Sequence, residues 1–101
     1  MTTLRIRVRF VDHSEKIYNS WDFLEKEIVV NIKSLYCGSN KLISLPDSLG
    51  KCTNLQYLNC KNNKLISLPD SLGNCTNLQV LQCYYNKLIS LPESLGNCTN
   101  L

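Results

Sequence analysis

The chain has 101 residues, with 11 basic and 8 acidic side chains and a formal net charge of +3. This length allows one domain at most, and so small a charge excess does not by itself indicate a nucleic acid or membrane partner. No run approaches the roughly eighteen apolar residues of a membrane span, and the amino terminus lacks the apolar core of an export signal, so we predict a cytoplasmic protein with reduced thiols.

Residues 1–31 differ in pattern from the rest of the chain. Residues 3–11 alternate apolar side chains with arginines, which predicts a strand with one apolar and one basic face. Further on, Trp21, Leu24 and Ile28 share one stripe of a possible short helix over residues 20–28, with Ser20 as its cap. We expect this segment to cap the open edge of the structure that follows.

From residue 32 the sequence repeats itself at a constant interval, without insertions. Three asparagines, three prolines and three glycines mark the interval: Asn40, Asn63 and Asn86; Pro46, Pro69 and Pro92; Gly50, Gly73 and Gly96. The units are residues 32–54, 55–77 and 78–100, and Leu101 is the first residue of a fourth. A fixed period of this length indicates stacked coils rather than a conventional globular core.

Each unit has the same internal order, shown by the second: Leu55-x-x-Leu58-x-Cys60-x-x-Asn63-x-Leu65. Leu58 and Cys60 alternate with polar residues, which predicts a short strand with one face inward. An asparagine at the end of that strand suits a bend, and stacked asparagines can bond neighbouring turns. We expect the leucines that follow to carry the chain back around the coil, with Gly73 permitting a tight reversal.

This pattern resembles the leucine-rich repeat, L-x-x-L-x-L/C-x-x-N-x-L, followed by the L-P-x-x-L tail typical of intracellular 23-residue forms such as those of Ras-binding scaffolds. The resemblance covers residues 32–101. It implies an α/β fold, a short right-handed solenoid with a parallel sheet on its concave face and a strand and helix cap at the amino terminus. It also implies a non-catalytic module that binds a protein partner through that concave face.

The remaining chemistry of the sequence does not predict catalysis. Six cysteines occur two per unit at inward positions and form no C-x-x-C pair, so core packing is favoured over a metal site or disulfides. Asp47, Asp70 and Glu93 form a periodic row rather than a facing pair, and His13, the only histidine, suits a solvated loop. We predict no enzyme, no cofactor and no metal.

The positions that vary between repeats are the outward strand positions, and they predict the binding surface. We expect four tyrosines with polar neighbours to form it, as rigid aromatic anchors beside adaptable side chains. The candidate partner-binding residues are Tyr36, Tyr57, Asn59, Lys61, Val80, Gln82, Tyr84 and Tyr85, with Ser34 in the same columns. Neutral drift on an unused face is the alternative interpretation of this variation.

Two further rows of side chains recur once per repeat, and their roles are left open. The lysines (Lys41, Lys64 and Lys87) form a line of like charge, and the isoleucines (Ile43, Ile66 and Ile89) form an apolar strip that could be exposed.

Other functions are also left open. Instead of an independent binding module, the chain could be a truncated or decaying fragment of a longer array, or a substrate-receptor subunit of an assembly such as a ubiquitin ligase. The strand that contains Leu81 and Cys83 is predicted to have a bare outer edge, where self-association is possible. Nucleic acid is not favoured, because alternation of arginine with apolar residues is ordinary for a half-exposed strand.

Overall fold

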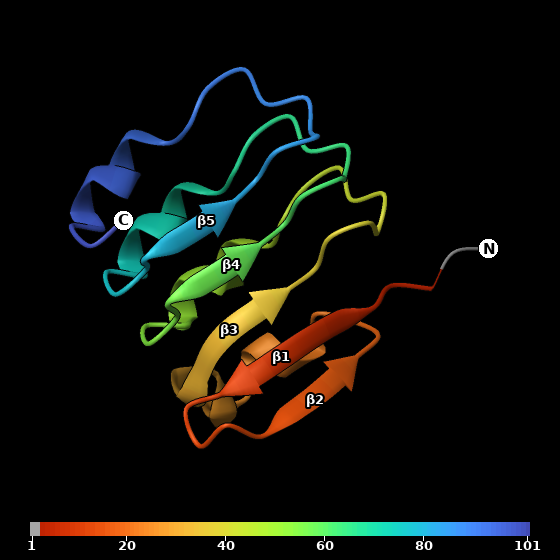
Figure 1. Cartoon of the computed structure of the whole chain (residues 1–101), viewed down its shortest axis with the longest axis vertical. Coiled ribbons are helices and arrows are strands. Elements are labelled where there is room, and N and C mark those ends of the chain that lie inside the picture. Colours follow the sequence, from red (N-terminus) through yellow and green to blue (C-terminus); the bar gives the residue numbers. More distant parts are fainter. Residues whose placement is uncertain (1–2) are drawn as a thin grey trace.

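The computed structural model describes residues 3–101 and contains one five-stranded sheet, in the order β2-β1-β3-β4-β5. Three of its strands come from the repeats and run parallel: β3 (Ile32–Tyr36), β4 (Tyr57–Asn59) and β5 (Val80–Gln82). Of these, β3 is the central strand of the sheet, and β4 and β5 lie on one side of it. After each of these three strands the chain arcs behind the sheet into a 3₁₀-helix, and from the first two of these helices it returns to the next strand (Figure 1). These helices are η3 (Asp47–Lys51), η4 (Asp70–Asn74) and η5 (Glu93–Asn97). The fold is therefore a solenoid of three coils.

The coils stack in register with the period of the sequence. Leu58 of β4 pairs with Leu35 of β3 on one side and with Leu81 of β5 on the other, so each leucine lies beside its equivalent in the adjacent repeat. Leu35 and Leu58 are fully buried, and Leu81, in the last strand, is half-buried. The inward positions predicted from the alternation are thereby confirmed for these leucines. Within residues 3–101 we find no helix with the length and apolar character needed to cross a bilayer.

The three repeated asparagines (Asn40, Asn63 and Asn86), here called the asparagine ladder, join adjacent coils. The Oδ1 of Asn63 accepts from the backbone N–H groups of Asn40 and Leu42, in the preceding coil, at 2.9 and 3.0 Å. Its Nδ2 donates to the carbonyls of Cys37 and Cys60, at 3.1 and 2.9 Å. Because both ends of the amide are used across the boundary between coils, the predicted role of asparagine is confirmed.

The repeated glycines have a different role from the one we expected. Gly73 lies in η4 and does not have a positive φ, so it does not reverse the chain in a left-handed conformation. A Cβ built on Gly73 would lie 2.5 Å from the Cβ of Ser94 in the next coil, and one on Gly50 would lie 2.8 Å from the Cβ of Ser71. Gly96 has no coil beyond it, and a Cβ there meets nothing within 4 Å. Glycine is therefore required where one coil packs on the next.

A hairpin caps the first coil. The strand expected over residues 3–11 forms as β1 (Ile6–Phe10), whose apolar face is buried and whose arginines are exposed. It pairs antiparallel with β3 and covers its edge. On its other side it pairs with β2 (Glu15–Tyr18), which the sequence analysis missed. The sheet is therefore mixed, and only its repeat strands are parallel.

The prediction of one short helix over residues 20–28 is wrong. Two 3₁₀-helices, η1 (Asp22–Glu25) and η2 (Glu27–Asn31), replace it, separated by Lys26 in an extended conformation with ψ 154°. Three consecutive β-branched residues, Ile28 to Val30, disfavour a continuous α-helix here. Phe23, Leu24 and Val29 are buried, whereas Ile28 of the predicted stripe is exposed.

Candidate functional site: the concave face of the sheet

The outward side chains of the repeat strands share one face, as their register requires. Tyr57 lies beside Val80, and Asn59 lies between Tyr36 and Gln82. Ser34 is the exception among the outward positions, because only 7% of its surface is exposed. It is paired with Arg9 on β1 as well as with Tyr57 on β4, and the small hydroxyl lies between these two larger side chains. Ser34 is therefore not available to a partner.

A line of contacts crosses this face from one strand to the next. The rings of Tyr36 and Tyr57 lie with their centroids 5.2 Å apart, and the hydroxyl of Tyr57 donates to Oε1 of Gln82 at 2.8 Å. Aromatic pairs and cross-strand hydrogen bonds of this kind restrict side-chain rotamers. The central part of the face is therefore ordered before any partner arrives, which lowers the entropic cost of binding.

The second tyrosine pair lies where β5 ends. The ring centroids of Tyr84 and Tyr85 are 5.1 Å apart in an edge-on arrangement, and the ammonium of Lys61 lies 5.6 Å from the Tyr84 ring. Tyr85 is 76% exposed and has φ 57°, in the left-handed region. Its equivalents in the other coils, Ser39 and Asn62, share this conformation. A residue with a β-carbon is strained in the left-handed region, and a tyrosine, unlike an asparagine, has no short polar side chain to offset this strain by a local hydrogen bond. Tyr85 is therefore the least favourable of the three residues at this position.

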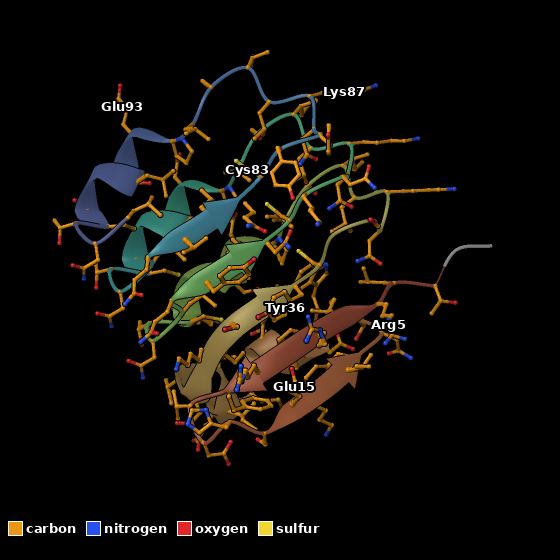
Figure 2. The ribbon with its side chains drawn as sticks, viewed as in Figure 1. Arg5, Glu15, Tyr36, Cys83, Lys87 and Glu93 are labelled. Carbon is orange, nitrogen blue, oxygen red and sulfur yellow. The ribbon has the colours of Figure 1, made fainter. Side chains whose placement is uncertain are left out.

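The hairpin adds residues to this face that the sequence analysis did not assign to it. Arg7 of β1 pairs with Tyr36, and its guanidinium carbon lies 4.0 Å from the centre of the Tyr36 ring. Its Nη1 also bonds Oε1 of Glu15 at 3.0 Å. The line of contacts therefore runs from Glu15 through Arg7 and Tyr36 to the repeat strands. Figure 2 shows Tyr36 and Glu15 over the sheet, far from Glu93 on the last coil.

A groove of about 540 Å³ opens on the concave face between the hairpin and the first two coils. We call it the cationic groove, because three of its lining residues carry positive charge and none carries negative charge. Its lining consists of Thr3, Arg5, Arg7, Tyr36, Gly38, Ser39, Asn40, Asn59 and Lys61. Its volume is in the usual range of ligand sites, roughly 300 to 1,000 Å³.

The backbone around this groove is held in place. Asn40 donates from Nδ2 to the carbonyl of Arg5 at 2.8 Å, and its Oδ1 accepts from the Arg5 N–H at 2.9 Å. The asparagine ladder therefore extends into the cap. Gly38 leaves room on the floor of the groove, since a Cβ there would lie 3.0 Å from the carbonyl oxygen of Lys61.

The isoleucine strip (Ile43, Ile66 and Ile89) is exposed in all three coils, as the sequence analysis allowed. It follows the strands rather than lying on them, and none of its members lines the cationic groove, so we treat it as a second candidate surface. The lysines of the other row are exposed as well, and Lys41 and Lys64 line a smaller hollow of about 220 Å³ that shares Ser39 with the cationic groove.

The cysteines lie in the core. Five are buried and Cys83 is half-buried, and all six are free thiols. Burial raises the pKa of Cys60 and of Cys75 to about 12, and that of Cys52 to about 11, so these groups are neutral thiols at ordinary pH. Within residues 3–101, no three histidine, cysteine or acidic side chains gather as a metal site. These thiols act as small apolar side chains.

Comparison with known families decides the classification. A family model described as leucine-rich repeats, in two copies, matches residues 30–74, and a single leucine-rich repeat model matches residues 77–98. The chain belongs to the leucine-rich repeat family. Leucine-rich repeat domains are generally protein-interaction modules, and the family is typically non-catalytic.

A solved structure agrees with this classification. The chain is similar to a leucine-rich repeat protein of Leptospira interrogans, with 32% identity and a TM-score of 0.69. The similarity covers 73% of this chain but 20% of the Leptospira protein, so this chain spans about a fifth of that protein's length. A search of curated proteins finds no match.

Proposed function

We propose that this leucine-rich repeat domain binds a protein partner through its concave face and has no catalytic activity of its own. The observation that carries this proposal is the ordered line of side chains across the sheet, from Arg7 over Tyr36 to the Tyr57 and Gln82 pair. Rigid aromatic side chains beside polar groups are typical of the residues that dominate binding energy in protein interfaces.

The strained backbone of Tyr85 supports the same surface. Its position in the repeat is held at positive φ in all three coils, and asparagine, which tolerates this conformation, occupies it in the second. Strain of this kind is found at functional sites, where a side chain is kept despite its cost. Tyr85 is well exposed and contacts Tyr84, so the pair offers an aromatic anchor at the rim of the face.

The isoleucine strip is the competing surface, since exposed apolar rows also mark contacts. The experiment therefore compares the two surfaces. Tagged wild-type chain, a Tyr57→Ala/Tyr84→Ala variant and an Ile66→Ser variant would each be used to capture proteins from the lysate of the source organism. Their folding would be checked by circular dichroism and thermal unfolding.

The proposal expects a captured protein that is lost with the double tyrosine variant and retained with Ile66→Ser. Retention by a folded double tyrosine variant, with loss on Ile66→Ser, would move the binding surface to the isoleucine strip and contradict the proposal.

A further inference from the structure

The charges of the chain are divided between its two sides. Six of the eight acidic residues lie in the 3₁₀-helices, behind the sheet: Asp22, Glu25, Glu27, Asp47, Asp70 and Glu93. Asp12 lies in the hairpin turn, so Glu15 is the one carboxylate in the line of contacts on the concave face. The concave face is therefore more positive than the formal net charge of +3 indicates.

The positive charge is concentrated in the cationic groove. Arg7 comes from β1 and Arg5 from the segment before it, whereas Lys61 follows β4, so the groove lies between two parts of the chain. Among the described residues, only Arg7 of these three has a carboxylate partner. That partner, Glu15, is itself about half exposed, so the ion pair is weak. A carboxylate of a ligand can therefore take the place of Glu15 beside Arg7.

The groove also contains the groups that recognise a carboxylate geometrically. A guanidinium offers paired N–H donors that match a carboxylate, and such charge-assisted bonds are roughly twice as strong as neutral ones. The guanidinium carbon of Arg7 lies 4.0 Å from the centre of the Tyr36 ring, and this contact restricts the directions of its donors. The amide of Asn59 lines the same groove, and its Nδ2 can donate to the backbone of an extended segment. The amide of Asn40, in contrast, is already used by its hydrogen bonds to Arg5.

We infer that the cationic groove takes an acidic segment of a protein partner, with carboxylates bound by Arg5, Arg7 and Lys61. This inference rests on the proposed function and specifies the chemistry of the partner. The smaller hollow, which shares Ser39, continues the positive surface to Lys41 and Lys64. An acidic segment that leaves the groove across the repeats therefore meets further lysines.

A protein segment fits these observations better than a nucleic acid. Proteins that bind nucleic acid through its backbone gain affinity with each phosphate that a lysine or arginine neutralises. The groove provides three cations on a concave surface, one of them shared with Glu15. Carboxylates in a short peptide need fewer contacts, and the planar fork of arginine suits them.

The test is a fluorescence anisotropy titration with three labelled probes at low salt. The probes are a short oligoglutamate peptide, an oligoglutamine peptide of the same length, and a single-stranded oligodeoxythymidine with the same number of charges. The variants are Arg5→Gln/Arg7→Gln and, on another strand, Lys61→Gln. Lys51→Gln is the matched control, because it removes the same kind of charge from η3, outside the groove.

Oligoglutamate is expected to bind the wild type more tightly than either of the other probes. The double arginine variant should weaken that binding at least about tenfold, because two charge-assisted contacts are lost, and Lys61→Gln should weaken it less. Lys51→Gln should change it by less than about twofold. Equal losses for Lys51→Gln and for the groove variants, or tighter binding of the oligodeoxythymidine, would overturn the inference.

The two proposals can fail separately. If captured protein depends on Tyr57 and Tyr84 but survives Arg5→Gln/Arg7→Gln, the concave face binds a partner that is not acidic, and only this inference fails. If oligoglutamate binds through the arginines, while capture survives the double tyrosine variant and is lost with Ile66→Ser, the groove is acid-specific but the partner uses the isoleucine strip, and the proposed function fails. The exposed arginine side chains should leave folding intact, and thermal unfolding checks this.

Discussion

Gly73 and Ser94, in successive coils, approach so closely that a Cβ on the glycine would lie 2.5 Å from the Cβ of the serine and 2.6 Å from its carbonyl oxygen. The carbonyl belongs to the backbone and cannot move without displacing the third coil. We therefore expect Gly73→Ala to lower the free energy of unfolding by about 2 kcal/mol. Urea denaturation measures this change.

Gly96 is the matched control for that substitution, at the equivalent position of the last coil. A Cβ there meets nothing within 4 Å, so Gly96→Ala should be neutral or stabilise the protein by up to about 1 kcal/mol. Equal destabilisation by the two substitutions would show that glycine is needed for its own backbone rather than for packing between coils.

The asparagine ladder makes a second prediction about stability. Asn63→Ala leaves the N–H groups of Asn40 and Leu42 without their acceptor, whereas the three carbonyls that its Nδ2 bonds each keep another donor. Because an unsatisfied buried group costs about 1 to 3 kcal/mol, we expect a loss of about 2 kcal/mol or more. Asn77→Ala, which removes one exposed bond to Thr53 at 3.2 Å, should cost less than about 1 kcal/mol. A loss no larger at Asn63 than at Asn77 would contradict the bridging role.

The strain at Tyr85 predicts a stabilising substitution. Tyr85→Asn places at this left-handed position the residue already present in the second coil, and should raise the free energy of unfolding by about 0.5 kcal/mol or more. Tyr84→Asn is the control, since Tyr84 has no positive φ. In the capture assay Tyr85→Asn should weaken binding while it stabilises the fold. Stabilisation by both substitutions, or by neither, would contradict the assignment of strain.

Burial of the thiols predicts their reactivity. Cys83 is the one half-buried cysteine, so a single thiol should react quickly with a disulfide reagent in the native protein. The other five thiols should react only as fast as local or global unfolding exposes them. Cys83→Ser should remove the fast phase. Any fast thiol that remains in that variant would contradict the burial of the other five cysteines.

The same thiols predict a loss of stability in alkali. Their ordinary pKa is 9.0, and burial raises that of Cys60 and Cys75 to about 12. The unfolded chain therefore loses thiol protons first, and the folded state loses stability as the pH rises from about 9 toward 12. Cys75→Val should make this decline shallower when unfolding is followed by denaturant titration at each pH. An unchanged slope would contradict the contribution of this thiol.

The sequence was sufficient to predict the repeat part of the fold. The alternation within each strand and the constant interval between repeats determine which of the side chains at Leu58, Cys60 and Asn63 point inward, and the register follows once the coils stack. The same two patterns place Tyr57 and Gln82 on the outer face, although their hydrogen bond to each other depends on rotamers that neither pattern specifies.

The cap could not be predicted to the same extent, because its pattern occurs once. β2 is short and mostly exposed, so it lacks the alternation that revealed β1. The position of Arg7 over Tyr36 depends on antiparallel pairing between segments that lie far apart in the chain, which nothing in the local sequence encodes. The cationic groove was missed for this reason, since three of its nine lining residues, including both arginines, come from the cap.

The central claim is that partners bind the concave face, and position-specific cross-linking tests it most directly. A photoreactive phenylalanine derivative would replace Tyr84 in one chain and Ile66, on the isoleucine strip, in another. After irradiation in the native lysate, the account predicts a cross-linked protein from position 84 and none from position 66. A cross-linked protein from position 66 alone, with both chains folded, would contradict it.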